Sequence, residues 1–243
     1  MSEEIYDTME TGGTLVECSE LTKLYGSKIA LSNLNLKLER GKIIGLLGPN
    51  GSGKTTLIKI LSGILTTSSG TVKVSGKPIG IETKKIVSYL PERTYLSEWM
   101  NVKQMIQFFC DFYTDFRPDT AYDMLKKLDI NPEDKLKTMS KGTREKVQLI
   151  LVMSREAELY LLDEPIGGVD PAARDYIIRT ILSNYSENAS VIISTHLISD
   201  IEKVLDEVVF IKNGNLVLHK SVDDIREENG KSVDEVFREV FAC

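Results

Sequence analysis

Residues 48–55 read GPNGSGKT and fit the pattern G-x-x-x-x-G-K-[ST], whose residue types suit phosphate binding. The glycines let the backbone curl so that successive N–H groups point at an anion, and a helix starting there adds its positive end. The lysine can reach the β- and γ-phosphates of a nucleotide, and the last hydroxyl can ligate Mg²⁺. We therefore expect a nucleotide site formed by Gly48, Pro49, Asn50, Gly51, Ser52, Gly53, Lys54, Thr55 and Thr56.

The same glycines would also suit an ordinary turn, so the flanking residues decide between the two interpretations. The apolar run IIGLL before the motif predicts a buried strand, and KTTLIKILSG after it has helical spacing. A phosphate-binding loop needs both flanking elements, because it joins a strand to the helix whose N-terminus faces the ligand. The context favours phosphate binding.

Two carboxylates stand side by side in YLLDEP, where another apolar run ends. Burying either one without a partner is strongly unfavourable, so either the pair faces water or a cation lies beside it. In P-loop folds a carboxylate at the end of a neighbouring strand binds Mg²⁺, so we expect Asp163 to ligate the metal together with Thr55. Glu164 would then act as general base or position the attacking water, a role that contributes roughly 10²–10⁴-fold in rate.

The composition restricts the class of protein that could carry this site. A chain of 243 residues, 42% of them hydrophobic, can form one large domain or a domain with a subdomain. Its net charge of −6 gives little support to a general nucleic-acid binder. The first residues lack the build of a secretion signal, and no apolar stretch reaches the roughly 18 residues that span a bilayer. The cysteines and histidines lack zinc-binding spacing and indicate a reducing cytosol: Cys18, Cys110, Cys243, His196 and His219.

Short apolar runs separated by helix-like segments predict the fold class. KIIGLLG, KIVSYL, ELYLL, SVIIS and EVVFI are typical of buried strands, so we expect an α/β domain with a mostly parallel sheet. TLVECS and the alternating NLNLKLERG predict further strands, whereas helical spacing after residue 93 indicates an inserted subdomain. We expect a disordered segment 1–13, a nucleotide-binding core of 14–92 and 157–220, a helical subdomain 93–156 and a helical tail 221–243.

Further motifs follow in the order found in the ATP-binding cassette (ABC) ATPases, and the chain resembles this family from about residue 14 to 220. Tyr25 lies upstream of the P-loop in KLYGSKIAL, and YLPER at 89–93 takes the place of the family's linking loop. MSKGT at 139–143 stands where the family has its signature, usually LSGGQ. LLDEP leads into GGVDP, which is similar to the family's D-loop, and STHL places a histidine 32 positions after Glu164.

The resemblance implies a P-loop core with an antiparallel β-subdomain, and a head-to-tail dimer that encloses two ATP molecules with Mg²⁺. The signature of one subunit would contact the γ-phosphate held by the other. Glu92 replaces the family's usual Gln, yet a carboxylate can still ligate Mg²⁺ or orient water. The implied site residues are Tyr25 for adenine stacking, Glu92 for metal and nucleotide, Ser140, Lys141 and Gly142 of the signature, Asp170 of the D-loop, and His196 as a catalytic residue beside Glu164.

Two of these motifs keep a second interpretation. Lys141, Arg144 and Lys146 lie near a helix N-terminus, where exposed cations oppose the helix dipole by roughly 0.3–1 kcal/mol each. A docking anion would remove this penalty, or the segment is a basic surface turn. Asp170 belongs to the D-loop or simply caps the helix that begins at Pro171.

Two apolar clusters and two short tail helices also follow from the sequence. The first cluster suits a groove for a partner helix, unless Trp99 packs the subdomain: Tyr95, Leu96, Trp99 and Met100. The second packs on its own domain or on a twin subunit: Val236, Phe237, Val240 and Phe241. SVDD at 221 and SVDE at 232 each predict the start of a helix.

The resemblance implies the ATP-binding and hydrolysing subunit of an ABC transporter, similar to those of bacterial exporters. Its expected partners are a second copy or a paralogous ATPase subunit, and integral membrane subunits on separate chains, with no nucleic acid. Such a subunit would lie in the cytoplasm, peripheral on the cytoplasmic face of the membrane. The alternative is an ABC ATPase of an assembly system of iron–sulfur type, without a transport role.

Overall fold

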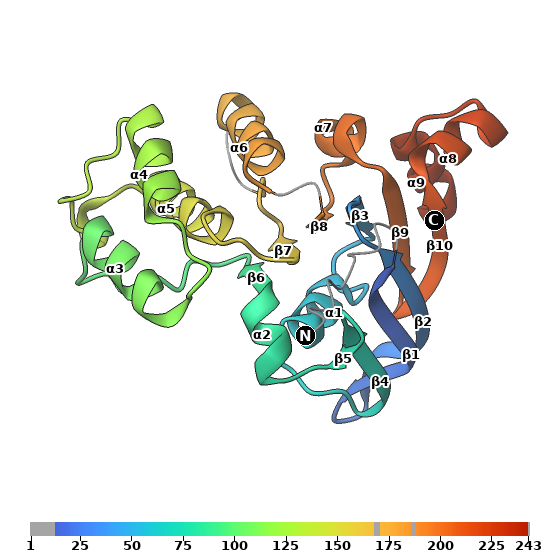
Figure 1. Cartoon of the computed structure of the whole chain (residues 1–243). Coiled ribbons are helices and arrows are strands. Elements are labelled where there is room, and N and C mark those ends of the chain that lie inside the picture. Colours follow the sequence, from blue (N-terminus) through green and yellow to red (C-terminus); the bar gives the residue numbers. More distant parts are fainter. Residues whose placement is uncertain (1–12, 168–170, 186–187, 243) are drawn as a thin grey trace, which may run out of the picture.

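The computed structural model describes residues 13–167, 171–185 and 188–242 (Figure 1). Its larger sheet has the strand order β10-β9-β3-β8-β7-β6. All neighbours run parallel except β10, which is antiparallel to β9. The strands are Ile43–Leu47 (β3), Val87–Leu90 (β6), Leu159–Asp163 (β7), Ser190–Thr195 (β8), Glu207–Lys212 (β9) and Asn215–Ser221 (β10). This mostly parallel sheet confirms the predicted α/β class.

A second sheet is antiparallel throughout and has the order β2-β1-β4-β5. In β2 the side chains of Leu34, Leu36 and Leu38 are buried and alternate with exposed polar residues, so one face of this sheet packs inward. The strands are Thr14–Tyr25 (β1), Lys28–Glu39 (β2), Ser69–Val74 (β4) and Lys77–Pro78 (β5). This sheet confirms the antiparallel subdomain that the family resemblance implies.

Helix α1 (Lys54–Leu61) packs between the two sheets, because its apolar side chains share one buried cluster with both of them. Alternate residues of β3, β7, β8 and β9 point the other way and form a second cluster with helices. Both faces of these strands are covered, which explains their continuous apolar runs. The remaining elements of the core and tail are α2 (Ile81–Ile86), α6 (Pro171–Asn184), α7 (Ile198–Ile201), the 3₁₀ turn Glu202–Val204, α8 (Val222–Asn229) and α9 (Val233–Phe241).

Helices α3 (Val102–Phe112), α4 (Pro118–Lys127) and α5 (Lys141–Met153), with the 3₁₀ turn Leu136–Thr138, form a lobe beside the sheet, at the left of Figure 1. Arg155 follows α5, is 3% exposed and connects this lobe to the sheet. Its guanidinium donates to Asp115 in the loop between α3 and α4, and to the carbonyl oxygen of Val87 in β6. The run KIVSYL begins in a helix, because Lys85 and Ile86 belong to α2.

The structure distinguishes between the interpretations of the two apolar clusters. Leu96 is buried but Trp99 is 71% exposed, so the interpretation that Trp99 packs the subdomain is wrong. In the tail, the rings of Phe237 and Phe241 lie 5.5 and 5.9 Å from that of Phe210 in β9. The tail therefore packs on its own domain, and α8 and α9 begin at the two predicted serine caps. Within the described residues, no helix has the length and apolar character needed to cross a bilayer.

Candidate active site

The loop of residues 48–53 joins β3 to α1, and the fold itself requires its glycines. A Cβ atom on Gly48 would lie 2.3 Å from the carbonyl oxygen of Ile211 in β9. Gly53 has a φ of +117°, and a Cβ atom there would lie 2.6 Å from the carbonyl oxygen of Ala30 in β2. Strands from both sheets thus approach the loop too closely for side chains at these two positions.

The turn between β9 and β10 is hydrogen-bonded to the phosphate-binding loop, a contact that could not be predicted from the sequence. The amide of Gly214 donates to the carbonyl oxygen of Ser52 at 2.8 Å, and the Gly214 carbonyl accepts from the amide of Ser32 at 2.9 Å. The adjacent Asn213–Gly214 pair is a recognisable turn signal. Its contact with the loop depends on the tertiary fold and is invisible in the sequence.

Lys54 begins α1, is 6% exposed, and donates from Nζ to the carbonyl oxygen of Gly48 at 2.7 Å. Burial lowers the pKa of Lys54, and the negative charges of Glu164, Asp163 and Glu92 counteract part of this lowering. The structure therefore brings one cation and the three predicted carboxylates into a single electrostatic environment. This explains how two carboxylates can stand side by side at the end of a buried strand.

Asp163 ends β7 and is 1% exposed. Its Oδ1 accepts hydrogen bonds from Ser194 Oγ at 2.6 Å and from Thr55 Oγ1 at 3.1 Å. Burial raises the pKa of Asp163, and these two hydrogen bonds counteract part of the rise. Its Oδ2 is buried and has no hydrogen-bond partner among the described residues. Because a buried carboxylate oxygen without a partner is unfavourable, a cation at this atom would be strongly stabilised.

The donor atoms around Asp163 fit a hard cation such as Mg²⁺. The Asp163 carboxylate and the Thr55 hydroxyl are oxygen ligands, which Mg²⁺ prefers. In the described part of the chain no group of three or more His, Cys, Asp or Glu side chains could hold a metal. Mg²⁺ usually combines one or two carboxylates with substrate phosphates, so this small donor set suits a nucleotide-bound metal. Glu92 is exposed, and its charge contributes to the raised pKa of Asp163.

Glu164 has a φ of +52°, a backbone conformation that is uncommon for residues other than glycine and often occurs at functional sites. Its amide donates to the Ser194 carbonyl oxygen at 3.0 Å and to Ser194 Oγ at 3.1 Å. Its Oε2 lies 3.0 Å from Nδ1 of His196. The structure thus brings together the two residues that the sequence predicts to be catalytic, at the carboxyl ends of β7 and β8.

Ser194 is a site residue that the sequence analysis missed. It pairs with Asp163 across β7 and β8, and its hydroxyl contacts both the Asp163 carboxylate and the Glu164 amide. The sequence offers only a serine near the end of the apolar run SVIIST, two positions before His196, and the structure shows that its side chain is fully buried.

Tyr25 and the signature segment lie at exposed positions. Tyr25 ends β1 and is 47% exposed, with Lys23 Nζ 5.4 Å from its ring centroid. Ser140 caps α5 by accepting from the Thr143 amide at 3.1 Å, and Lys141 and Gly142 form the exposed first turn. Asp170 lies outside the described residues, so neither of its two interpretations is tested.

Carboxylates already offset part of the positive charge at the start of α5. Arg144 Nη1 lies 2.6 Å from Glu98 Oε1, and Lys141 Nζ lies 3.7 Å from Glu145 Oε1. The positive charge at this helix end is therefore partly neutralised within the chain, even without a docking anion. Two of them have partners within the chain, and the dipole penalty is correspondingly smaller.

The parallel sheet, the loop at the end of β3 and the carboxylates at the end of β7 define a P-loop nucleotide-binding protein. The family model described as ABC transporter matches residues 31–167, more than half of the sequence. The chain belongs to this family, as an ATP-binding subunit, and the match confirms the resemblance seen in its motifs.

Individual relatives agree with this assignment. An uncharacterized ABC transporter ATP-binding protein of Synechocystis is 29% identical over 87% of this chain, and the match spans 64% of that relative's length. The SkfA peptide export ATP-binding protein SkfE of Bacillus subtilis is also 29% identical, over 88% of this chain and 92% of SkfE. A solved structure of an ATP-binding subunit of an ABC transporter has a TM-score of 0.85 and 27% identity, covering 93% of this chain and 99% of that one.

Proposed function

We propose that the chain hydrolyses Mg²⁺-bound ATP and thereby drives a conformational change in separate membrane-spanning subunits. The observation that supports this most directly is the hydrogen-bonded series that starts at the first turn of α1 and ends at the exposed imidazole: Thr55, Asp163, Ser194, Glu164 and His196. It places a metal-ligating carboxylate and a potential general base on adjacent residues next to the phosphate-binding loop.

The hydrolytic step divides between these side chains. Lys54, now bonded to the loop carbonyl of Gly48, is placed to transfer its hydrogen bonds to phosphate oxygens. Glu164 accepts the proton of the attacking water, and His196 orients the Glu164 carboxylate through its Nδ1 contact. Mg²⁺, when bound, neutralises developing charge on the phosphate oxygens. The metal would be held by Asp163 Oδ2 and Thr55 Oγ1.

A second copy of the chain, or a paralogous ATPase subunit, would complete each site. The exposed first turn of α5 offers the Ser140 hydroxyl and the Gly142 amide to a phosphate held by another subunit. The exposed ring of Tyr25 supports a stacking role toward adenine. In this proposal the core of residues 14–92 and 157–220 holds ATP, and the lobe of residues 93–156 closes over the neighbour's nucleotide.

The membrane partner would dock on the lobe, and the complex would lie on the cytoplasmic face of the membrane. The exposed Tyr95 and Trp99 support this docking, because aromatic side chains that face solvent often mark a partner surface. The relationship to SkfE supports export as the direction of transport.

The test is ATP turnover by the purified chain with Mg²⁺, together with co-purification of the chain from detergent-solubilised membranes. Lys54→Ala should abolish nucleotide binding and turnover, because it removes the buried cation of the site. Lys37→Ala, at a lysine whose side chain is 71% exposed on β2, is the matched control and should behave as wild type. Wild-type protein that neither binds nor hydrolyses Mg²⁺-ATP would contradict the proposal, as would failure to co-purify with a membrane fraction.

A further inference from the structure

The hydroxyl group of Tyr89 is not explained by the site described above. Tyr89 lies in β6, and its ring packs against the apolar cluster around α1. Its hydroxyl oxygen is buried and has no hydrogen-bond partner among the described residues. Leaving a buried hydroxyl unpaired is unfavourable, and such a group in a native protein calls for a partner, such as an ordered water or a bound ion.

The strand register places Tyr89 beside the proposed metal site. Tyr89 pairs with Leu161 across the parallel strands β6 and β7. Side chains alternate along a strand, so Leu161 and Asp163 share the face of β7 that looks toward α1. The hydrogen bond from Thr55 of α1 to Asp163 shows independently that Asp163 faces this way.

The charges around the hydroxyl agree with this placement. Burial raises the pKa of Tyr89, and the negative charges of Asp163 and Glu92 raise it further. These effects favour the neutral phenol, and they indicate that the phenol lies within electrostatic range of both carboxylates predicted to contact the metal.

Tyr89 Oη and Asp163 Oδ2 are thus both buried without a hydrogen-bond partner among the described residues, and both side chains lie on the face of the sheet toward α1. They could satisfy one another only if they were in contact, and the structure shows no hydrogen bond between them. A hydrated cation would satisfy both, because Asp163 Oδ2 would ligate the metal and the phenol oxygen would accept a hydrogen bond from a water of its hydration shell.

We propose that Tyr89 is a positioning residue for the metal, with its hydroxyl hydrogen-bonded to a water of the Mg²⁺ that Asp163 and Thr55 would hold. The inference rests on the proposed function, since it needs a Mg²⁺–nucleotide at this site. It assigns a specific role to the first residue of the YLPER segment, three positions before Glu92.

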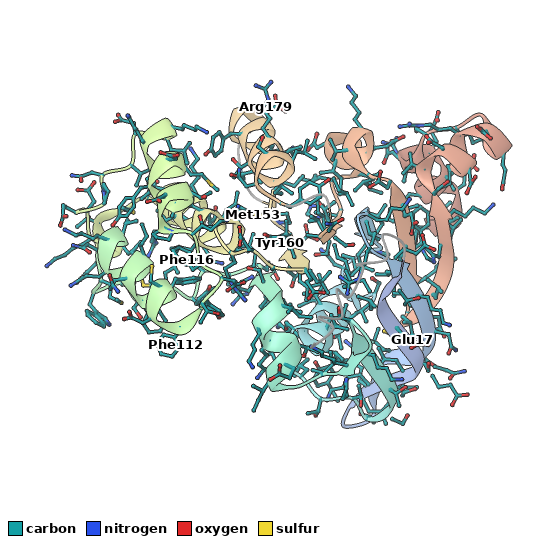
Figure 2. The ribbon with its side chains drawn as sticks, in the orientation of Figure 1. Glu17, Phe112, Phe116, Met153, Tyr160 and Arg179 are labelled. Carbon is teal, nitrogen blue, oxygen red and sulfur yellow. The ribbon has the colours of Figure 1, made fainter. Side chains whose placement is uncertain are left out.

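Tyr160 offers a matched control on the neighbouring strand. Tyr160 is 1% exposed and belongs to the apolar cluster on the opposite face of the sheet. In Figure 2 it lies on the side of β7 toward the helical lobe. Its hydroxyl donates to the carbonyl oxygen of Arg155 at 2.5 Å, so this phenol is fully partnered within the chain. The Tyr→Phe substitution removes a hydroxyl group from the same sheet at both positions. The hydroxyl has no partner among the described residues at Tyr89, and it is hydrogen-bonded at Tyr160.

The experiment is calorimetric titration of the full chain with a non-hydrolysable ATP analogue, in Mg²⁺ and again in EDTA, with thermal melting of the nucleotide-free proteins. Tyr89→Phe should weaken binding in Mg²⁺ by roughly threefold to tenfold, the value of one hydrogen bond, and leave binding in EDTA unchanged. Its melting temperature should equal or exceed that of wild type, because an unpaired buried hydroxyl is lost. Tyr160→Phe should melt lower and keep the wild-type Mg²⁺ dependence.

Three results would overturn the role of Tyr89 alone: an unchanged Mg²⁺ dependence in Tyr89→Phe, an equal loss in Mg²⁺ and in EDTA, or a drop in melting temperature like that of Tyr160→Phe. Failure of the proposed function can be told apart from failure of the Tyr89 role, because it would appear in the binding measurements on the wild-type chain. If wild type binds no analogue, or binds it equally with and without Mg²⁺, the metal site itself is wrong and the role of Tyr89 fails with it.

Discussion

The guanidinium of Arg155 binds the carboxylate of Asp115 through two nitrogens, with Nε 3.1 Å from Oδ1 and Nη2 3.0 Å from Oδ2. The ring of Tyr113 lies 3.9 Å from the guanidinium carbon. The same guanidinium also donates to the carbonyl oxygens of Val87 at 2.7 Å and Lys85 at 2.6 Å. One side chain therefore joins the loop between α3 and α4 to the start of β6.

Asp115→Asn should lower the free energy of unfolding by about 2–3 kcal/mol, because it leaves the charge of Arg155 buried without its carboxylate. Urea denaturation measures this loss. Asp123→Asn, at an exposed position on α4, is the control and should change stability by less than about 0.5 kcal/mol. A loss in Asp115→Asn no larger than that of the control would mean that the pair does not hold the lobe to the sheet.

The carboxylate of Glu158 should make stability depend on pH. Burial would raise the pKa of Glu158, but hydrogen bonds from Ser75 at 2.6 Å and Arg40 at 2.7 Å outweigh it and hold the pKa below the ordinary 4.5. A carboxyl group whose pKa is lowered by folding stabilises the protein above its unfolded pKa and loses this effect as the pH falls through the folded value.

Glu158→Gln should therefore be less stable than wild type at about pH 7, and the difference should shrink as the pH falls below 4.5. Urea denaturation at about pH 7 and about pH 3 measures both values. A difference that stays constant across this range would contradict the assignment of the stabilisation to the ionised carboxylate.

Glu164→Gln should bind ATP but lower turnover by about 10²–10⁴-fold, because the amide cannot accept the proton of the attacking water. The nucleotide-bound protein should then accumulate as a dimer, since hydrolysis no longer reopens it. Gel filtration with Mg²⁺-ATP separates dimer from monomer. Finding only monomer together with normal turnover would rule out this role for Glu164.

Glu92→Gln should retain most of the ATPase activity, because an amide oxygen can still contact the metal or orient a water. Steady-state turnover over a Mg²⁺ titration measures this. A fall of about a hundredfold or more would show that the charge of Glu92 is essential. The carboxylate would then act differently from the Gln that usually occupies this position in the family.

The parts of the site that lie on one continuous stretch can be predicted from the sequence. Residues 48–55 and the pair Asp163 and Glu164 carry their own patterns of glycine, hydroxyl and carboxylate. Residues whose role depends on strand register cannot be found in this way. Ser194 matters because it pairs with Asp163 across two strands, and Tyr89 because it stands beside Leu161 on the face toward α1.

The same distinction between local patterns and tertiary contacts applies to the fold. The apolar runs indicate both sheets because the strands are covered on two faces or alternate on one. The contact of the tail with β9 could not be predicted, because the apolar stripe of α9 would suit its own domain or another subunit equally well. Only the position of Phe210 decides between them.

Strand β9 links the tail directly to the nucleotide loop. The side chain of Phe210 packs against Phe237 of α9, while the carbonyl oxygen of the next residue, Ile211, closes the space beside Gly48. A change in how α9 packs on Phe210 therefore acts one residue away from the carbonyl oxygen that closes the space beside the phosphate-binding loop.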